Sequence, residues 1–83
     1  MKICAYDRTF EGSPMEIVES LRQLLFNITD IPDAEAYIRH IKRTYQMAYN
    51  REMILPDVDL DGRIRAMFAI LEDAGLMEVV EYA

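Results

Sequence analysis

Three aspartates at alternate positions are the clearest set of side chains for chemistry in this sequence. Asp57, Asp59 and Asp61 are followed directly by Gly62. Carboxylate oxygens are ligands that Ca²⁺ and Mg²⁺ prefer, and a glycine allows the chain to turn sharply around a bound ion. The segment therefore predicts weak binding of a divalent cation.

The same segment resembles the beginning of the calcium-binding loop of EF-hand proteins. Oxygen-bearing residues occupy its first, third and fifth positions, glycine occupies the sixth and Ile64 the eighth. The resemblance covers residues 57–64 only. The twelfth position, where the loop needs a bidentate glutamate, is Phe68, and Pro56 directly precedes the loop. The alternative interpretation is that the aspartates cap a helix that begins here and complement its positive end.

Groups for nucleophilic or metal-assisted catalysis do not form a set in the sequence. His40 is the only histidine and Cys4 the only cysteine, so the spacing of zinc ligands is absent. Ser13 is expected to cap a helix, and Ser20 lies on that helix with no obvious base beside it. The glycines are isolated, which excludes a glycine-rich phosphate loop. We therefore predict no catalytic residues, no cofactor and a protein that is not an enzyme.

A cationic cluster is the second feature with functional meaning. Residues 39–51 contain four cations, Arg39, Lys42, Arg43 and Arg51, and no acidic residue, although the whole chain carries a net charge of −6. Most of these cations fall on the outward face of a predicted helix. Tyr49 lies among them, and tyrosine is a side chain that protein interfaces favour. Together with Tyr49, the four cations form the predicted interaction surface.

The two oppositely charged segments favour a non-enzymatic protein-interaction module. The cations of residues 39–51 and the acids of residues 57–61 can meet across a two-fold axis, so the expected partner is a protein, including a second copy in a homodimer. One alternative is a regulatory nucleic-acid binder that uses the same cationic face. The net charge of −6 disfavours it, because an acidic chain repels phosphate backbones. The other alternative is the divalent-cation binding described above.

The composition is typical of one small globular domain over residues 1–83. Apolar residues make up 52% and charged residues 29%, far from the composition of disordered chains. A single cysteine permits no intrachain disulfide, which favours a reducing compartment. The charged start and a longest apolar run of only residues 66–71 predict no export signal, no membrane span and a cytoplasmic location. A core of this size leaves little room for a large ligand.

Capping signals predict where the helices begin and end. Residues 13–16 form a capping box with proline at the first helical position, and the apolar face of this helix extends to Ile28. Residues 29–32 break the helix because they end in proline. A second helix begins near Asp33. A third follows the connector of residues 51–56, is capped by Asp57, Asp59 or Asp61, and ends before Gly75.

The second helix has a clear division between an inward and an outward stripe. Its apolar stripe consists of Ala34, Tyr37, Ile38, Ile41, Tyr45 and Ala48. The tyrosines and methionines of the chain are expected mostly in the core. Those that one small subunit cannot bury are expected to pack against another chain.

Both ends of the chain predict strands. Residues 2–10 form one strand or a tight hairpin that turns near Asp7 and Arg8, where the glycine or asparagine of common two-residue turns is missing. Residues 76–82 predict a closing strand, and pairing of the terminal strands satisfies their backbone groups. The predicted fold is therefore α+β, with a small sheet of two or three strands (the N-terminal strand or hairpin plus the C-terminal strand) packed against three helices.

Overall fold

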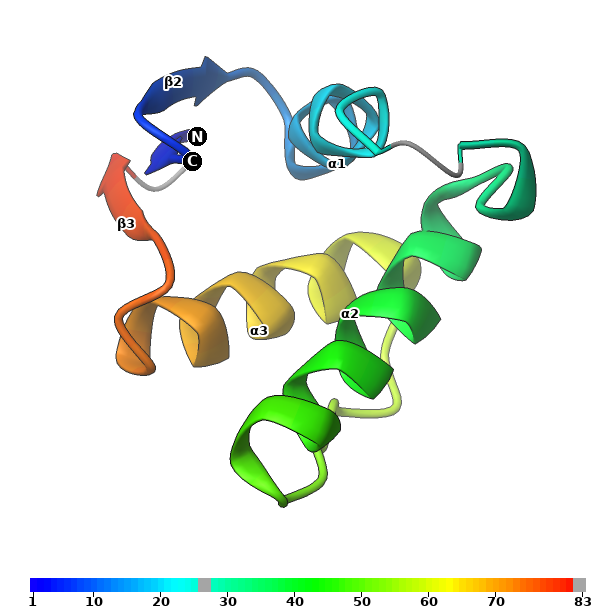
Figure 1. The fold of residues 1–83 in the computed structure, drawn as a ribbon. Coiled ribbons are helices and arrows are strands. Elements are labelled where there is room, and N and C mark those ends of the chain that lie inside the picture. The colour runs from blue at the N-terminus through cyan, green and yellow to red at the C-terminus, as the bar shows by residue number, and fades with distance from the viewer. Residues whose placement is uncertain (26–27, 82–83) are drawn as a thin grey trace.

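The computed structural model, which describes residues 1–25 and 28–81, confirms the α+β fold (Figure 1). The described elements are, in chain order, β1 (Lys2–Ala5), β2 (Arg8–Glu11), α1 (Pro14–Arg22), a 3-10 turn (Ile28–Asp30), α2 (Ala34–Tyr49), α3 (Leu60–Asp73) and β3 (Glu78–Glu81). The strands form one antiparallel sheet in the order β2-β1-β3. The terminal strands β1 and β3 are therefore neighbours, as their need for backbone partners predicts.

Of the two alternatives for the N-terminal segment, the structure contains the hairpin. Its strands are paired so that Ala5 lies opposite Arg8, which places Tyr6 and Asp7 in the turn, one residue earlier than predicted. Both turn residues have positive φ, 54° and 61°, as in the type I′ turns that suit twisted strands. This register puts Ile3 and Ala5 in the core, and a shift by one residue would turn both side chains outward.

Helix α1 begins as predicted and ends earlier than predicted. The Ser13 hydroxyl accepts from the Glu16 amide at 3.2 Å, and the Glu16 carboxylate accepts from the Ser13 amide at 3.0 Å. The helix ends at Arg22, although its apolar face was predicted to extend to Ile28. The Arg22 side chain donates to the Ile31 carbonyl oxygen at 2.9 Å, a contact with a residue nine positions away that periodicity does not encode.

The predicted start of α2 and the predicted end of α3 are confirmed. Asp33 caps α2 by accepting from the Ala36 amide at 2.8 Å. Helix α3 ends where Gly75 takes a φ of 79° and the following amide donates to the Leu71 carbonyl at 2.9 Å. Strand β3 is shorter than the predicted strand of residues 76–82, of which Tyr82 lies outside the described residues.

The core joins the sheet to all three helices. Its largest side chains with less than 2% exposure are Phe68, Ile3, Ile17, Met53, Ile64, Met67 and Val18. The connector between α2 and α3 buries Met53 in the core and leaves Ile54 77% exposed. In Figure 1 this connector runs from the end of α2 back to the beginning of α3. Helix α2 buries Ala34, Ala36, Tyr37, Ile38 and Tyr45 on its inward side.

Candidate functional site

The predicted cationic face lies on the outward side of α2. Arg39 and Arg43 are exposed and Lys42 is half-buried. Within residues 1–25 and 28–81, none of these three cations forms an ion pair. Met47, one helical turn after Arg43, is 80% exposed on the same side. The face therefore presents positive charge beside an exposed apolar side chain, and the nucleic-acid alternative, which uses the same residues, stays a prediction.

The other two residues of the predicted surface contact each other near the end of α2. The Arg51 guanidinium lies 5.9 Å from the ring centroid of Tyr49 and 5.7 Å from that of Tyr45. The two tyrosine rings are 4.9 Å apart. Arg51 is thus held over an aromatic pair, a favourable position for a guanidinium, and it extends the cationic face beyond the helix.

The three aspartates do not surround a common point. Asp59 caps α3 by accepting from the Gly62 amide at 2.9 Å, and Asp61 pairs with Arg65 at 2.8 Å. Helix α3 begins at Leu60, so most of the segment is helical where an EF-hand loop would wrap around an ion. The described residues contain no group of three or more His, Cys, Asp or Glu side chains that could hold a metal ion. The helix-cap interpretation is confirmed for Asp59.

Gly62 has a packing explanation that needs no ion. A Cβ atom at this position would lie 2.7 Å from Val58 Cγ2 and 3.0 Å from Asp59 Oδ1. Because the cap brings Val58 against the first turn of α3, only glycine fits there without a shift of its neighbours.

The groups considered for nucleophilic chemistry have structural contacts. Ser13 caps α1, and the Ser20 hydroxyl donates to the Glu16 carbonyl at 3.1 Å. Cys4 lies in β1 with its Sγ 3.6 Å from Thr9 Oγ1. His40 lies on α2, with its ring centroid 6.5 Å from that of Tyr37.

An ion pair between helices was not predicted. The Arg63 guanidinium on α3 makes two hydrogen bonds to the Glu35 carboxylate on α2, one of them at 2.9 Å. These hydrogen bonds lower the pKa of Glu35, although partial burial opposes the shift. Arg63 Nε is the only fully buried side-chain nitrogen or oxygen among the described residues that lacks a partner. The pair fixes the beginning of α2 against α3, and so helps position the outward face.

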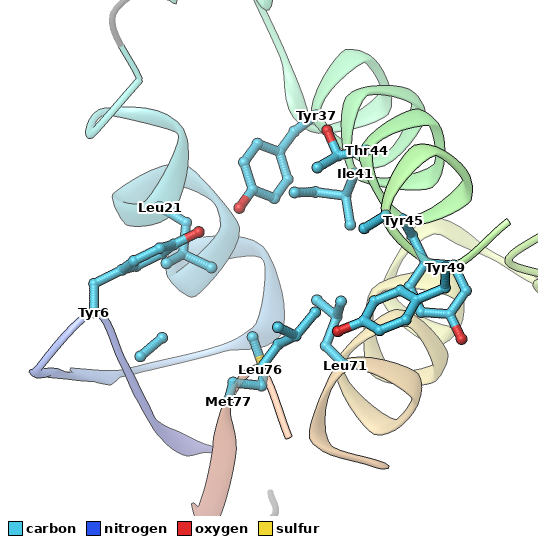
Figure 2. A pocket seen from close by; sticks show the side chains of 12 residues that line it. Tyr6, Leu21, Tyr37, Ile41, Thr44, Tyr45, Tyr49, Leu71, Leu76 and Met77 are labelled. Carbon is cyan, nitrogen blue, oxygen red and sulfur yellow. The ribbon is translucent and has the colours of Figure 1, made fainter. Parts of the chain in front are cut away.

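An apolar pocket of roughly 260 Å³ lies between α2 and the hairpin turn (Figure 2). Tyr6 comes from the turn, and Tyr37, Tyr45 and Tyr49 come from α2. Leu21 and side chains at the end of α3 and before β3 complete the wall. The volume of this pocket is below the usual range of about 300–1,000 Å³ for drug-sized ligands.

The Tyr37 hydroxyl is the polar group of interest in this pocket. Tyr37 is only 3% exposed, and burial raises the pKa of its phenol well above the ordinary value. The hydroxyl makes no hydrogen bond within the described part of the chain. Its oxygen is not fully buried, so it faces open space. In Figure 2 the hydroxyl points away from α2 toward Tyr6. Sequence reasoning placed Tyr37 in the core and overlooked that its polar tip needs a partner.

Comparisons of the chain with protein-family models, curated proteins and solved structures find no match. Within the described ranges, no helix has both the length and the apolar character needed to cross a membrane.

Proposed function

We propose that this protein is a non-enzymatic interaction module that associates with itself. In this dimer the outward face of α2 contacts the acidic segment of residues 57–61 from a second copy. The observation that carries the proposal is that one chain has two surfaces of opposite charge that complement each other. Met47, 80% exposed, stands beside Arg43, and Val58, 48% exposed, stands between two aspartates. Each surface thus combines one sign of charge with an accessible apolar side chain.

Electrostatics support this choice of partner. Two copies with a net charge of −6 repel each other at long range, and contacts between unlike charges offset this repulsion at the interface. Arg39 and Arg43 are exposed and have no ion pair among the described residues, so no internal salt bridge must be broken on binding. In a dimer with two-fold symmetry, each contact between a cation and an acid would occur twice.

Composition of the surface supports the same arrangement. Arginine, methionine and tyrosine are enriched in the buried centres of protein interfaces. Arg43 and Met47 lie on the outward face, and Tyr49 lies at the end of α2, where it is 38% exposed and also lines the inward pocket. Arg51, stacked over Tyr49, has part of its mobility already restricted, which lowers the entropy lost on association.

The test is the molar mass from light scattering after size exclusion, over a range of protein and salt concentrations. Arg43→Glu and Asp57→Lys each replace an attraction by a repulsion, and each should weaken the dimer by at least about tenfold. The variant that carries both changes exchanges the charges and should regain the dimer. Added salt should weaken the wild-type dimer.

Glu11→Lys is the matched control for Asp57→Lys, because it makes the same change in net charge at an exposed carboxylate on β2. It should leave the dimer at least as stable as wild type. A wild-type chain that is monomeric at every concentration contradicts the proposal, and so does an equal loss of dimer in Asp57→Lys and Glu11→Lys.

A further inference from the structure

We propose that the pocket between Tyr6 and α2 binds a small neutral aromatic molecule that carries one hydrogen-bond acceptor. The site uses the inward face of α2, whereas self-association is proposed for the outward face. The proposal rests on three properties of the pocket: a polar group without a partner, an uncharged wall and a limited volume.

The Tyr37 hydroxyl, like that of Tyr45 in the same wall, has no hydrogen-bond partner among the described residues. Buried polar groups nearly always have a hydrogen-bond partner, and one that lacks a partner needs an explanation. Tyr37 as a whole residue is only 3% exposed, and its hydroxyl oxygen faces the pocket (Figure 2). Its phenol stays protonated under ordinary conditions and can donate a hydrogen bond. A bound acceptor such as a carbonyl oxygen would satisfy it.

The wall of the pocket excludes a charged ligand. Its described lining residues include no Asp, Glu, Lys, Arg or His, and they are mostly aromatic and aliphatic. An ion in such surroundings would lose its hydration without gaining a counter-charge. The ligand that fits is therefore apolar apart from its single acceptor.

The volume and the aromatic wall indicate the size and shape of the ligand. An engineered cavity of about 150 Å³ accommodates benzene, and this pocket has roughly 260 Å³, so one or two rings fit. Tyr6 lies across the pocket from Tyr37 (Figure 2) and is 72% exposed in its turn. A bulky residue with positive φ is uncommon, and here it presents a ring that can stack on a planar guest.

The experiment compares two probes of the same size by two-dimensional NMR titration of the full chain. Acetophenone offers a carbonyl acceptor, and α-methylstyrene replaces that carbonyl oxygen by a CH₂ group. Saturable shifts are expected at pocket residues such as Tyr6 and Leu76. Wild type should bind acetophenone about fivefold more tightly than α-methylstyrene, as one hydrogen bond allows. Tyr37→Phe should remove this difference and leave the binding of α-methylstyrene unchanged.

Two further variants test the location. Ala48→Phe fills the pocket from its exposed rim and should abolish binding of both probes. Ala69→Phe makes the same change at an exposed helical alanine that does not line this pocket, and it should bind like wild type. No saturable shift in wild type, equal affinities for the two probes, or normal binding by Ala48→Phe would each overturn the proposal. None of these results depends on whether the chain forms a dimer.

Discussion

Tyr6 and Asp7 show how a single turn can depart from its common sequence. Type I′ turns favour asparagine and glycine, because a positive φ is sterically unfavourable for most other L-residues. The hairpin forms here without either residue, since the buried positions Ile3 and Ala5 determine the register. The local conformation is thus imposed by packing of the strand, and the turn stores a modest conformational cost.

Asp7→Gly should therefore raise the free energy of unfolding, by about 1 kcal/mol, because glycine takes a φ of 61° without steric cost. Urea denaturation followed by circular dichroism measures the change. Thr9→Gly, in the strand that follows, is the control and should lower stability by about 0.5–1 kcal/mol. A loss of stability in Asp7→Gly would contradict the turn geometry.

Glu35 is the residue for which a pH dependence is expected. The hydrogen bonds from Arg63 lower its pKa in the folded chain, so folding favours the carboxylate. Its contribution to stability is complete above the pKa of the unfolded chain and is lost as pH falls through the folded pKa. Glu35→Gln should therefore destabilise the protein at neutral pH, and the difference from wild type should shrink in acid.

Urea midpoints at neutral and acidic pH give this difference. Glu11→Gln, at an exposed glutamate with no ion pair among the described residues, is the matched control and should show no such pH-dependent difference. A Glu35→Gln penalty that is the same at both pH values would mean that the ion pair with Arg63 does not contribute through its charge.

Among the elements, α1 depends most on its cap, because it has only nine residues. Ser13→Ala removes the acceptor for the Glu16 amide and should lower the free energy of unfolding by about 1 kcal/mol. Ser20→Ala is the comparison within the same helix. Its hydroxyl bonds back to a carbonyl that is already part of the helix, so its loss should change stability by less than about 0.5 kcal/mol. Equal effects of the two substitutions would show that the capping box is not the stabilising feature.

At the scale of the whole molecule, the sheet closes through contacts between the two ends of the chain. Val79 lies opposite Ile3, and both are buried, whereas Val80 on the same strand is 51% exposed. Val79→Ala should lower the free energy of unfolding by about 2 kcal/mol, since two buried carbon atoms are lost. Val80→Ala should cost less than about 0.5 kcal/mol. Chemical denaturation of the pair measures the contrast, and similar losses would argue against the β1–β3 register.

The sequence alone determined the class of the fold and the starts of α1 and α2, and it limited the start of α3 to three candidate caps, of which the structure contains Asp59. Ser13, Asp33 and Asp59 cap helices because each side chain bonds an amide three residues along, and such short-range contacts are visible in sequence. The amphipathic stripe of α2 likewise follows from periodicity alone. These features need no knowledge of what the rest of the chain does.

Only the tertiary structure decided where α1 stops, where the hairpin turns and which polar groups remain without partners. The end of α1 is accompanied by a hydrogen bond from Arg22 to the Ile31 carbonyl, and the turn at Tyr6 goes with a register that buries Ile3. The pocket at Tyr37 exists because the hairpin turn and α2, distant in sequence, lie on either side of a space that the core does not fill. Such features depend on how separate elements pack, and no local pattern of residues specifies that packing.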